Sequence, residues 1–155
     1  MSLSTPVPQS QAEEAIVRLM KLPWVSFGNV DAGASYQAID TEKLDTRSFA
    51  AFPALIGLYA RDKMIMDPSD AVRRMTWMAA QRLNLKDRGK IAAGMAADIV
   101  VFKPETVSDR ATYEKSGPYF SAIKWVVVNG IVVVEDGKYN GSRPGKIIRG
   151  PGYRP

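Results

Sequence analysis

The sequence predicts an α+β protein in which helices occupy the first half and a small antiparallel sheet the second. Apolar residues recur at helical spacing between residues 10 and 85, and short β-branched runs follow after residue 96. Turn residues separate these runs, among them Asn129-Gly130, which strongly favours a tight hairpin. A chain of 155 residues, 46% of them hydrophobic, has room for one domain or two small ones.

The composition argues against several kinds of site. The chain has no cysteine, which excludes disulfides and thiolate ligands, and no histidine, the usual ligand of hydrolytic metals and the usual base of serine hydrolases. The net charge is +5, but the basic residues gather only in the tail at 138–154, so we expect a solvated tail and no nucleic-acid partner. Because no apolar run reaches roughly 18 residues, we expect a soluble, cytoplasmic protein without a membrane partner.

The first predicted unit is a helix followed by a strand. Residues 10–13, Ser-Gln-Ala-Glu, have the pattern of a capping box and begin an amphipathic stretch of about three turns. Pro23 ends this stretch. The apolar residues 24–27 then predict a short strand.

Two further helices are expected before residue 85. The first spans about residues 50–61, where Pro53 would be tolerated because it falls in the first turn. The second begins at Asp67-Pro68, which pairs an N-cap with a proline at the first helical position. Its predicted apolar stripe consists of Val72, Met75, Ala79 and Leu83.

The second half begins with two turns and a strand. Gly89 and Gly94 supply backbone freedom for the turns, and residues 97–102 form an apolar run of strand length. Asp98 lies at the start of that strand, where we expect it to accept backbone N–H groups from the Gly94 turn. Residues 109–114 are expected to form a helical turn.

A hairpin is predicted next, with strands at 123–128 and 131–135 joined by Asn129-Gly130. Asp136-Gly137 makes the following turn, and the tail starts at Tyr139. Both hairpin strands are apolar on both faces, a pattern that requires cover on each side and neighbours along each edge. We therefore expect a homo-oligomer that forms through the hairpin at 123–135.

Residues 87–102, Asp-Arg-Gly-x-Ile-x-x-Gly-x-x-Ala-Asp-Ile-Val-Val-Phe, carry a family resemblance. Together with Trp-Val-Ser-Phe-Gly at 24–28 and Val-Asn-Gly-Ile-Val-Val at 128–133, they resemble the N-acyl-D-amino-acid deacylases (D-aminoacylases) of the amidohydrolase superfamily. The resemblance runs from about residue 12 to about residue 153 and covers the C-terminal third of the family's length.

The resemblance implies a fold built from two parts of a larger enzyme. Residues 1–85 would be the last strand and helices of a (β/α)8 amidohydrolase barrel. Residues 86–155 would be the C-terminal strands of the small composite β-sandwich, followed by the basic Gly/Pro tail. In the family, the N-terminal part supplies the other sandwich strands and the histidine ligands, and we expect this chain to lack that part.

The resemblance also implies two site residues. Asp31 would be the acid at the end of the last barrel strand, which in the family binds metal and acts as general base. Arg47 would clamp the carboxylate of the substrate, since a guanidinium binds a carboxylate with two hydrogen bonds. Asp45 stands where the family commonly has histidine, so that role does not transfer. Judged on the residues alone, Asp31 also fits a glycine-flanked turn, and Arg47 also fits a surface arginine at the end of the polar loop at 32–47.

These implications lead to two functional hypotheses. The first is the C-terminal portion of a metal-dependent amidohydrolase that acts on N-acyl amino acids, inactive as an isolated chain. Zinc is expected for the family, and with no histidine this chain is expected to bind none by itself. The alternative is a non-catalytic, self-associating truncated domain.

Overall fold

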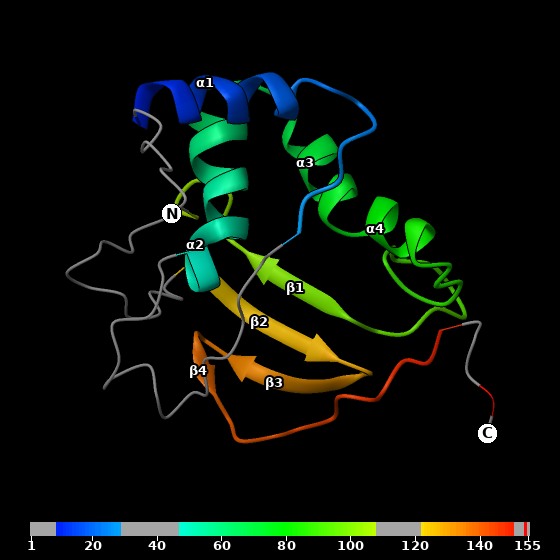
Figure 1. Ribbon diagram of the computed structural model, residues 1–155. Helices are drawn as coiled ribbons and strands as arrows, with labels where there is room; N and C mark the ends of the chain where they lie inside the picture. Colours follow the sequence, from blue (N-terminus) through cyan, green and yellow to red (C-terminus); the bar gives the residue numbers. More distant parts are fainter. Residues whose placement is uncertain (1–8, 29–46, 108–121, 151–153, 155) are drawn as a thin grey trace, which may run out of the picture.

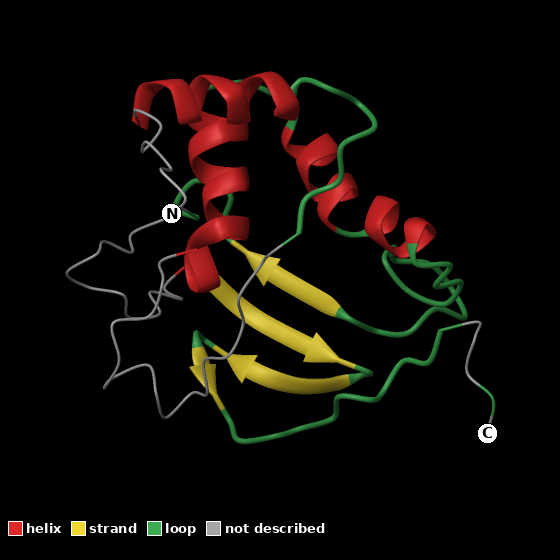
Figure 2. Cartoon of the chain, in the orientation of Figure 1, coloured by secondary structure: helices red, strands yellow, loops and turns green. Residues whose placement is uncertain are grey.

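A computed structural model describes residues 9–28, 47–107, 122–150 and 154, with the backbone alone for residues 9–10 and 47–50. The helices lie together, and a four-stranded sheet lies next to them (Figures 1 and 2). Within these ranges, no helix combines the length and the apolar character needed to cross a membrane. The α+β class is confirmed. Asp31, Asp45, most of the polar loop at 32–47 and the turn expected at 109–114 lie outside the described residues.

The described residues include four α-helices and one π-helix. Their bounds are α1 Gln9–Met20, α2 Arg47–Ala54, η1 Leu55–Asp62, α3 Pro68–Met75 and α4 Trp77–Arg82.

The helix α1 starts differently from the capping-box prediction. It begins at Gln9, so Ser10 lies inside the helix rather than at its cap. The Glu13 side chain accepts a hydrogen bond from the Tyr59 hydroxyl at 3.0 Å and one from the Lys63 ammonium. The acid therefore joins α1 to η1, because partners on a distant helix are available to it.

Pro53 lies in the interior of α2 and not in a first turn, which corrects the predicted start of this helix. Proline donates no backbone hydrogen bond and its ring crowds the preceding turn. The chain continues directly as the π-helix η1. At its C-terminal end the Lys63 N–H donates to the Leu58 carbonyl at 2.9 Å. Leu55, Gly57 and Ala60 of η1 are buried.

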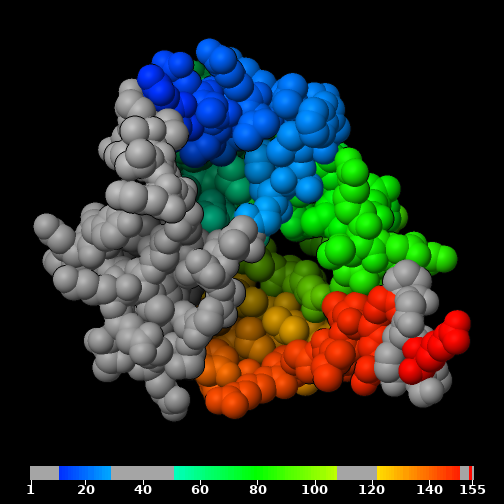
Figure 3. Space-filling view, in the orientation of Figure 1, coloured from blue at the N-terminus to red at the C-terminus, as the bar shows by residue number. Residues whose placement is uncertain are grey.

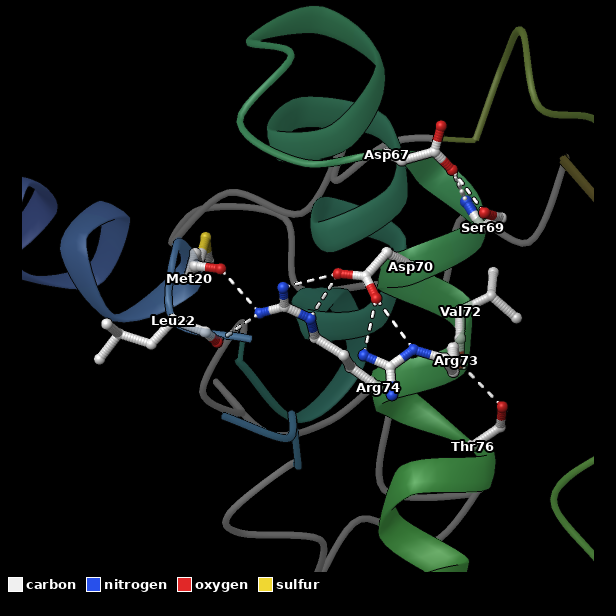
Figure 4. A network of polar contacts seen from close by, with 9 residues as sticks. All are labelled: Met20, Leu22, Asp67, Ser69, Asp70, Val72, Arg73, Arg74 and Thr76. Atoms are coloured by element: carbon white, nitrogen blue, oxygen red, sulfur yellow. Dashed lines mark hydrogen bonds and ion pairs between the residues drawn. The ribbon is translucent and has the colours of Figure 1, made fainter. Parts of the chain in front are cut away.

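The start of α3 is confirmed. Asp67 is the N-cap, and its carboxylate accepts the Ser69 N–H at 2.7 Å (Figure 4). The predicted apolar stripe was wrong in part: Val72, Met75 and Ala79 are only half-buried and Leu83 is 66% exposed. The buried residues are Ala71 and Arg74 in α3 and Met78 and Ala80 in α4. The stripe was misplaced because an apolar pattern does not anticipate a buried arginine.

Residues 24–27 form no strand, contrary to the prediction. Residues 23–24 form a turn, in which the Val25 N–H donates to the Leu22 carbonyl at 3.2 Å, and the Phe27 N–H donates to the Arg74 carbonyl at 3.5 Å. Trp24 is 62% exposed. A strand requires neighbours along its edges, and among the described residues the sheet contains none that pair with this segment.

The sheet confirms the hairpin and adds a strand. Its strands are β1 Ile99–Phe102, β2 Ile123–Val128, β3 Ile131–Glu135 and β4 Lys138–Tyr139, in the order β1-β2-β3-β4 with every neighbouring pair antiparallel. Asn129 and Gly130 both have positive φ, 47° and 81°, as the tight turn requires. The tail was expected from Tyr139, but that residue pairs with Val134.

The core is shallow in the part of the chain that the structure describes. No large side chain there is fully buried, and several apolar residues of the sheet are well exposed. These are Val100 at 53%, Val101 at 47%, Trp125 at 36% and Ile131 at 51%. The sheet therefore leaves apolar surface uncovered.

Candidate functional site

The segment between α1 and Gly28 is held by a buried arginine of α3. Arg74 is only 5% exposed, and its Nη1 donates to the carbonyl oxygens of Met20 and Leu22, both at 2.8 Å (Figure 4). Its guanidinium carbon lies 5.8 Å from the centre of the Phe27 ring. One side chain thus ties the end of α1 and the following segment to α3.

Asp70 balances the buried charge of Arg74. One carboxylate oxygen pairs with Arg74 at 2.6 Å, and the other accepts from Arg73 at 2.8 Å (Figure 4). Burial acts to raise the pKa of Asp70, but the hydrogen bonds from Arg73 and Arg74 outweigh it and hold the pKa below its usual range. A carboxylate that stays ionised lets Arg74 remain buried as a cation.

The structure tests the two predicted site residues only through their surroundings. Asp31 follows three residues after Gly28, where the described segment ends, and lies outside the described residues. Arg47 is the first residue of α2, and its side chain lies outside the description as well. Their roles therefore stay predictions.

The donor atoms of this chain do not fit a zinc site. The sequence contains neither histidine nor cysteine. Within the described ranges, no three Asp or Glu side chains gather closely enough to hold a metal ion. Since zinc sites are built mainly from imidazole and thiolate ligands, a zinc ion would need ligands from outside this chain.

A second polar cluster joins the strand β1 to the hairpin turn. The Asp98 carboxylate accepts the Asn129 N–H at 2.8 Å and pairs with Arg88 at 2.5 Å. The expectation that Asp98 binds the Gly94 turn was wrong. The hairpin turn lies beside the start of β1, as the bond from the Gly130 N–H to the Ala97 carbonyl shows, and it takes the place of the Gly94 turn.

Sequence reasoning missed Arg74 as a positioning residue. One signal was present: Asp70 and Arg74 are four residues apart on one helix face, the spacing of a stabilising ion pair. The same spacing is usual on exposed helices, so it does not by itself indicate burial.

The comparisons with known proteins decide the family. A model described as the amidohydrolase family matches residues 30–138. This chain belongs to the amidohydrolase family.

Two relatives of this amidohydrolase chain are named for acting on D-amino-acid compounds. It is 36% identical over 146 residues to a D-aminoacylase of Alcaligenes xylosoxydans xylosoxydans, covering 92% of this chain and 30% of that protein. It is 37% identical over 103 residues to an N-acyl-D-glutamate deacylase of the same organism, covering 66% of this chain and 21% of the relative. The chain therefore spans less than a third of the length of these curated relatives, and its resemblance to the D-aminoacylases is confirmed.

Solved structures agree with the sequence matches. A D-aminoacylase examined for the role of its binuclear metal centre has a TM-score of 0.74 and 32% identity, covering 84% of this amidohydrolase chain and 26% of its own. The N-acyl-D-glutamate deacylase of Bordetella bronchiseptica, solved with zinc and a phosphonate inhibitor, has a TM-score of 0.56 and 37% identity. The match covers 57% of this chain and 19% of the deacylase chain. The described part thus has an amidohydrolase-type fold.

Proposed function

We propose that this chain is the C-terminal portion of a metal-dependent hydrolase that cleaves the amide bond of N-acyl-D-amino acids. The observation that carries the proposal is the similarity to a D-aminoacylase along 92% of the chain. In this proposal residues 1–85 belong to the catalytic barrel and residues 86–155 to the β-sandwich, and the histidine ligands of the metal come from outside the chain.

Two side chains would serve the reaction directly. Asp31 would accept a proton from the attacking water and pass it to the leaving amine, and Arg47 would bind the substrate carboxylate with two parallel hydrogen bonds. The anchoring of Phe27 and Leu22 by Arg74 supports this role for Asp31, because it holds the segment that leads to the acid. The chain by itself would hydrolyse nothing, even with added zinc.

A chimera tests the proposal. The region of the Alcaligenes D-aminoacylase that matches this chain is replaced by the chain, and hydrolysis of an N-acetyl-D-amino acid is measured. We expect an active chimera in which Asp31→Asn lowers kcat by roughly 10²- to 10⁴-fold, the usual contribution of a general base. We expect Arg47→Lys to raise KM more than it lowers kcat, because lysine cannot make the two parallel bonds.

Asp136→Asn is the matched control, since Asp136 also lies in a glycine-containing turn and its side chain is 72% exposed. This variant should keep full activity. An active chimera that tolerates Asp31→Asn would exclude Asp31 as the base. Hydrolysis by the purified 155-residue chain would exclude the need for outside ligands.

The alternative function is a non-catalytic, self-associating domain. The exposed apolar residues of the sheet favour it, since uncovered strands recruit other strands. In this alternative a second copy of the chain would cover the hairpin at 123–135. Light scattering should then find a dimer that Ile131→Lys disrupts and that Ile147→Lys, at an 82% exposed tail position, preserves. A monomer at high concentration would contradict self-association.

A further inference from the structure

The C-terminal third of the chain contains two asparagine–glycine pairs, Asn129-Gly130 and Asn140-Gly141. In such a pair the backbone nitrogen of the glycine can attack the asparagine side chain. Glycine makes this attack easy, because it has no Cβ and its backbone is permissive. The sequence alone treats the two pairs as equals, whereas the structure gives them different surroundings.

The first difference is the availability of the glycine nitrogen. The Gly130 N–H donates to the Ala97 carbonyl at 3.0 Å, and Asn129 is constrained at φ 47° in the hairpin turn. Gly141 is exposed, and its N–H donates to no acceptor within the described part of the chain. Attack by the Gly130 nitrogen would require breaking its bond to Ala97, whereas the Gly141 nitrogen has no such bond to break among the described residues.

The second difference is the activation of the side-chain amide. The Oδ1 of Asn140 accepts the Ser142 N–H at 2.9 Å, which draws electrons from Cγ and stabilises the oxyanion that forms when a nucleophile adds. Both asparagines donate from Nδ2 to a backbone carbonyl at 2.8 Å, Asn129 to Pro144 and Asn140 to Val132, so these bonds do not distinguish them. The bond to Oδ1 of Asn140 makes the difference.

We propose that Asn140 is a site of spontaneous deamidation and that the fold protects Asn129. The Gly141 nitrogen gives up its proton to a solvent base and forms a bond to Cγ of Asn140. The bond from Cγ to Nδ2 then breaks, and ammonia leaves. Water opens the resulting succinimide at either carbonyl, which yields aspartate or isoaspartate. Water is consumed and ammonia released, with no oxidation or reduction.

Deamidation would loosen the segment 140–150, which leads from the end of the sheet and lies on the molecular surface in the view of Figure 3. The Nδ2 of Asn140 donates to the Val132 carbonyl at 2.8 Å, and the reaction removes this donor. A carboxylate would then face a carbonyl oxygen, which is a repulsive contact. The isoaspartate product also lengthens the backbone and displaces the Ser142 N–H.

Peptide mass mapping of the intact chain during storage in mildly alkaline buffer tests the proposal. In the folded chain, we expect Asn140 to deamidate at least about tenfold faster than Asn129, and the two rates to converge in urea. Equal rates in the folded chain would overturn the proposal. A rate at Asn140 that falls well below its rate in urea would overturn it too.

A second measurement tests the structural consequence. We expect storage to make the chain several-fold more sensitive to trypsin cleavage after Lys146, because cleavage follows local opening. Asn140→Gln is the control, since glutamine does not readily form the corresponding ring. The trypsin sensitivity of this variant should not change during storage. Equal gains in sensitivity in the stored wild type and the stored variant would contradict the proposed loosening.

Discussion

The carboxylate of Asp98 accepts the backbone N–H of Asn129 at 2.8 Å, which joins the start of β1 to the turn between β2 and β3. The Gly130 N–H reinforces this junction by donating to the Ala97 carbonyl at 3.0 Å. Since β1 pairs with β2 over only four residues, the junction contributes to holding β1 in register.

Replacing Asp98 with alanine should destabilise the sheet. The change removes a charged acceptor from the Asn129 N–H and the partner of Arg88. We expect the free energy of unfolding to fall by about 1.5–3 kcal/mol, the range for hydrogen bonds to charged groups, as measured by urea denaturation. Asp87→Ala is the control. Asp87 also contacts Arg88, but only at 3.4 Å, and is 63% exposed, so its loss should cost less than about 0.5 kcal/mol.

Replacing Arg74 with alanine should unfold the junction between α1 and α3. The change leaves the carbonyls of Met20 and Leu22 without their donor and Asp70 without its buried partner. We expect a loss of about 3–5 kcal/mol, the usual result of removing one partner of a buried pair.

Arg73→Ala provides the matched control for Arg74. Arg73 pairs with the same carboxylate but is 44% exposed, so its removal should cost at most about 1 kcal/mol. Denaturation of both variants can be followed by tryptophan fluorescence. Equal losses would mean that the pair with Asp70, and not the contacts to α1, carries the effect.

Two glycines separate steric contact from backbone strain. A Cβ at Gly89 would lie 2.7 Å from the Ala80 Cβ, and φ there is +90°, whereas a Cβ at Gly94 would meet nothing within 4 Å at φ +81°. We expect Gly94→Ala to cost roughly 1–2 kcal/mol from the left-handed backbone alone, and Gly89→Ala to cost roughly 1–3 kcal/mol more. Thermal unfolding of the two variants measures the difference. Equal costs would show that α4 moves aside easily.

Glu13 should make stability depend on pH. The hydrogen bond from Lys63 lowers the pKa of Glu13, with a smaller contribution from Tyr59. A carboxyl with a lowered folded-state pKa stabilises the fold above its unfolded-state pKa, and this contribution disappears as the pH falls through the folded-state value. We therefore expect Glu13→Gln to flatten the decrease in urea midpoint between about pH 5 and about pH 3.

Glu14→Gln is the control for Glu13. Glu14 is 71% exposed and its carboxylate lies 3.9 Å from the Arg18 guanidinium. The urea midpoint of Glu14→Gln should therefore depend on pH as that of the wild type does. Since Glu13 is itself 37% exposed, solvent screens its pairing and the effect should shrink at high salt. An unchanged slope in Glu13→Gln would show that the bond to Lys63 does not form in solution.

The sequence anticipated the local features of the fold well. Asn129-Gly130 correctly predicted the hairpin, and the predicted ranges of its two strands match the observed ones. Asp67-Pro68 correctly predicted the start of α3. The family was anticipated as well, from the residues at 87–102. The elements expected at 24–27 and 50–61 were less accurate, since one lacks pairing partners and the other continues as a π-helix past Pro53.

The candidate site divides in the same way. Asp31 and Arg47 were predicted through the family resemblance, because spacing alone does not distinguish a catalytic acid from a turn residue. Arg74 was not predicted, because its role depends on the Met20 carbonyl, 54 residues away along the chain.

The sequence by itself determined the hairpin with its Asn129-Gly130 turn, the start of α3 and the family, since turns and caps depend on the backbone preferences of the residues within them. Only the tertiary structure decided which polar side chains meet: Arg74 with the end of α1, Asp98 with the hairpin turn, and Glu13 with η1. The physical reason is that a hydrogen bond requires two groups within about 3 Å, and folding alone brings together groups that are distant in the sequence.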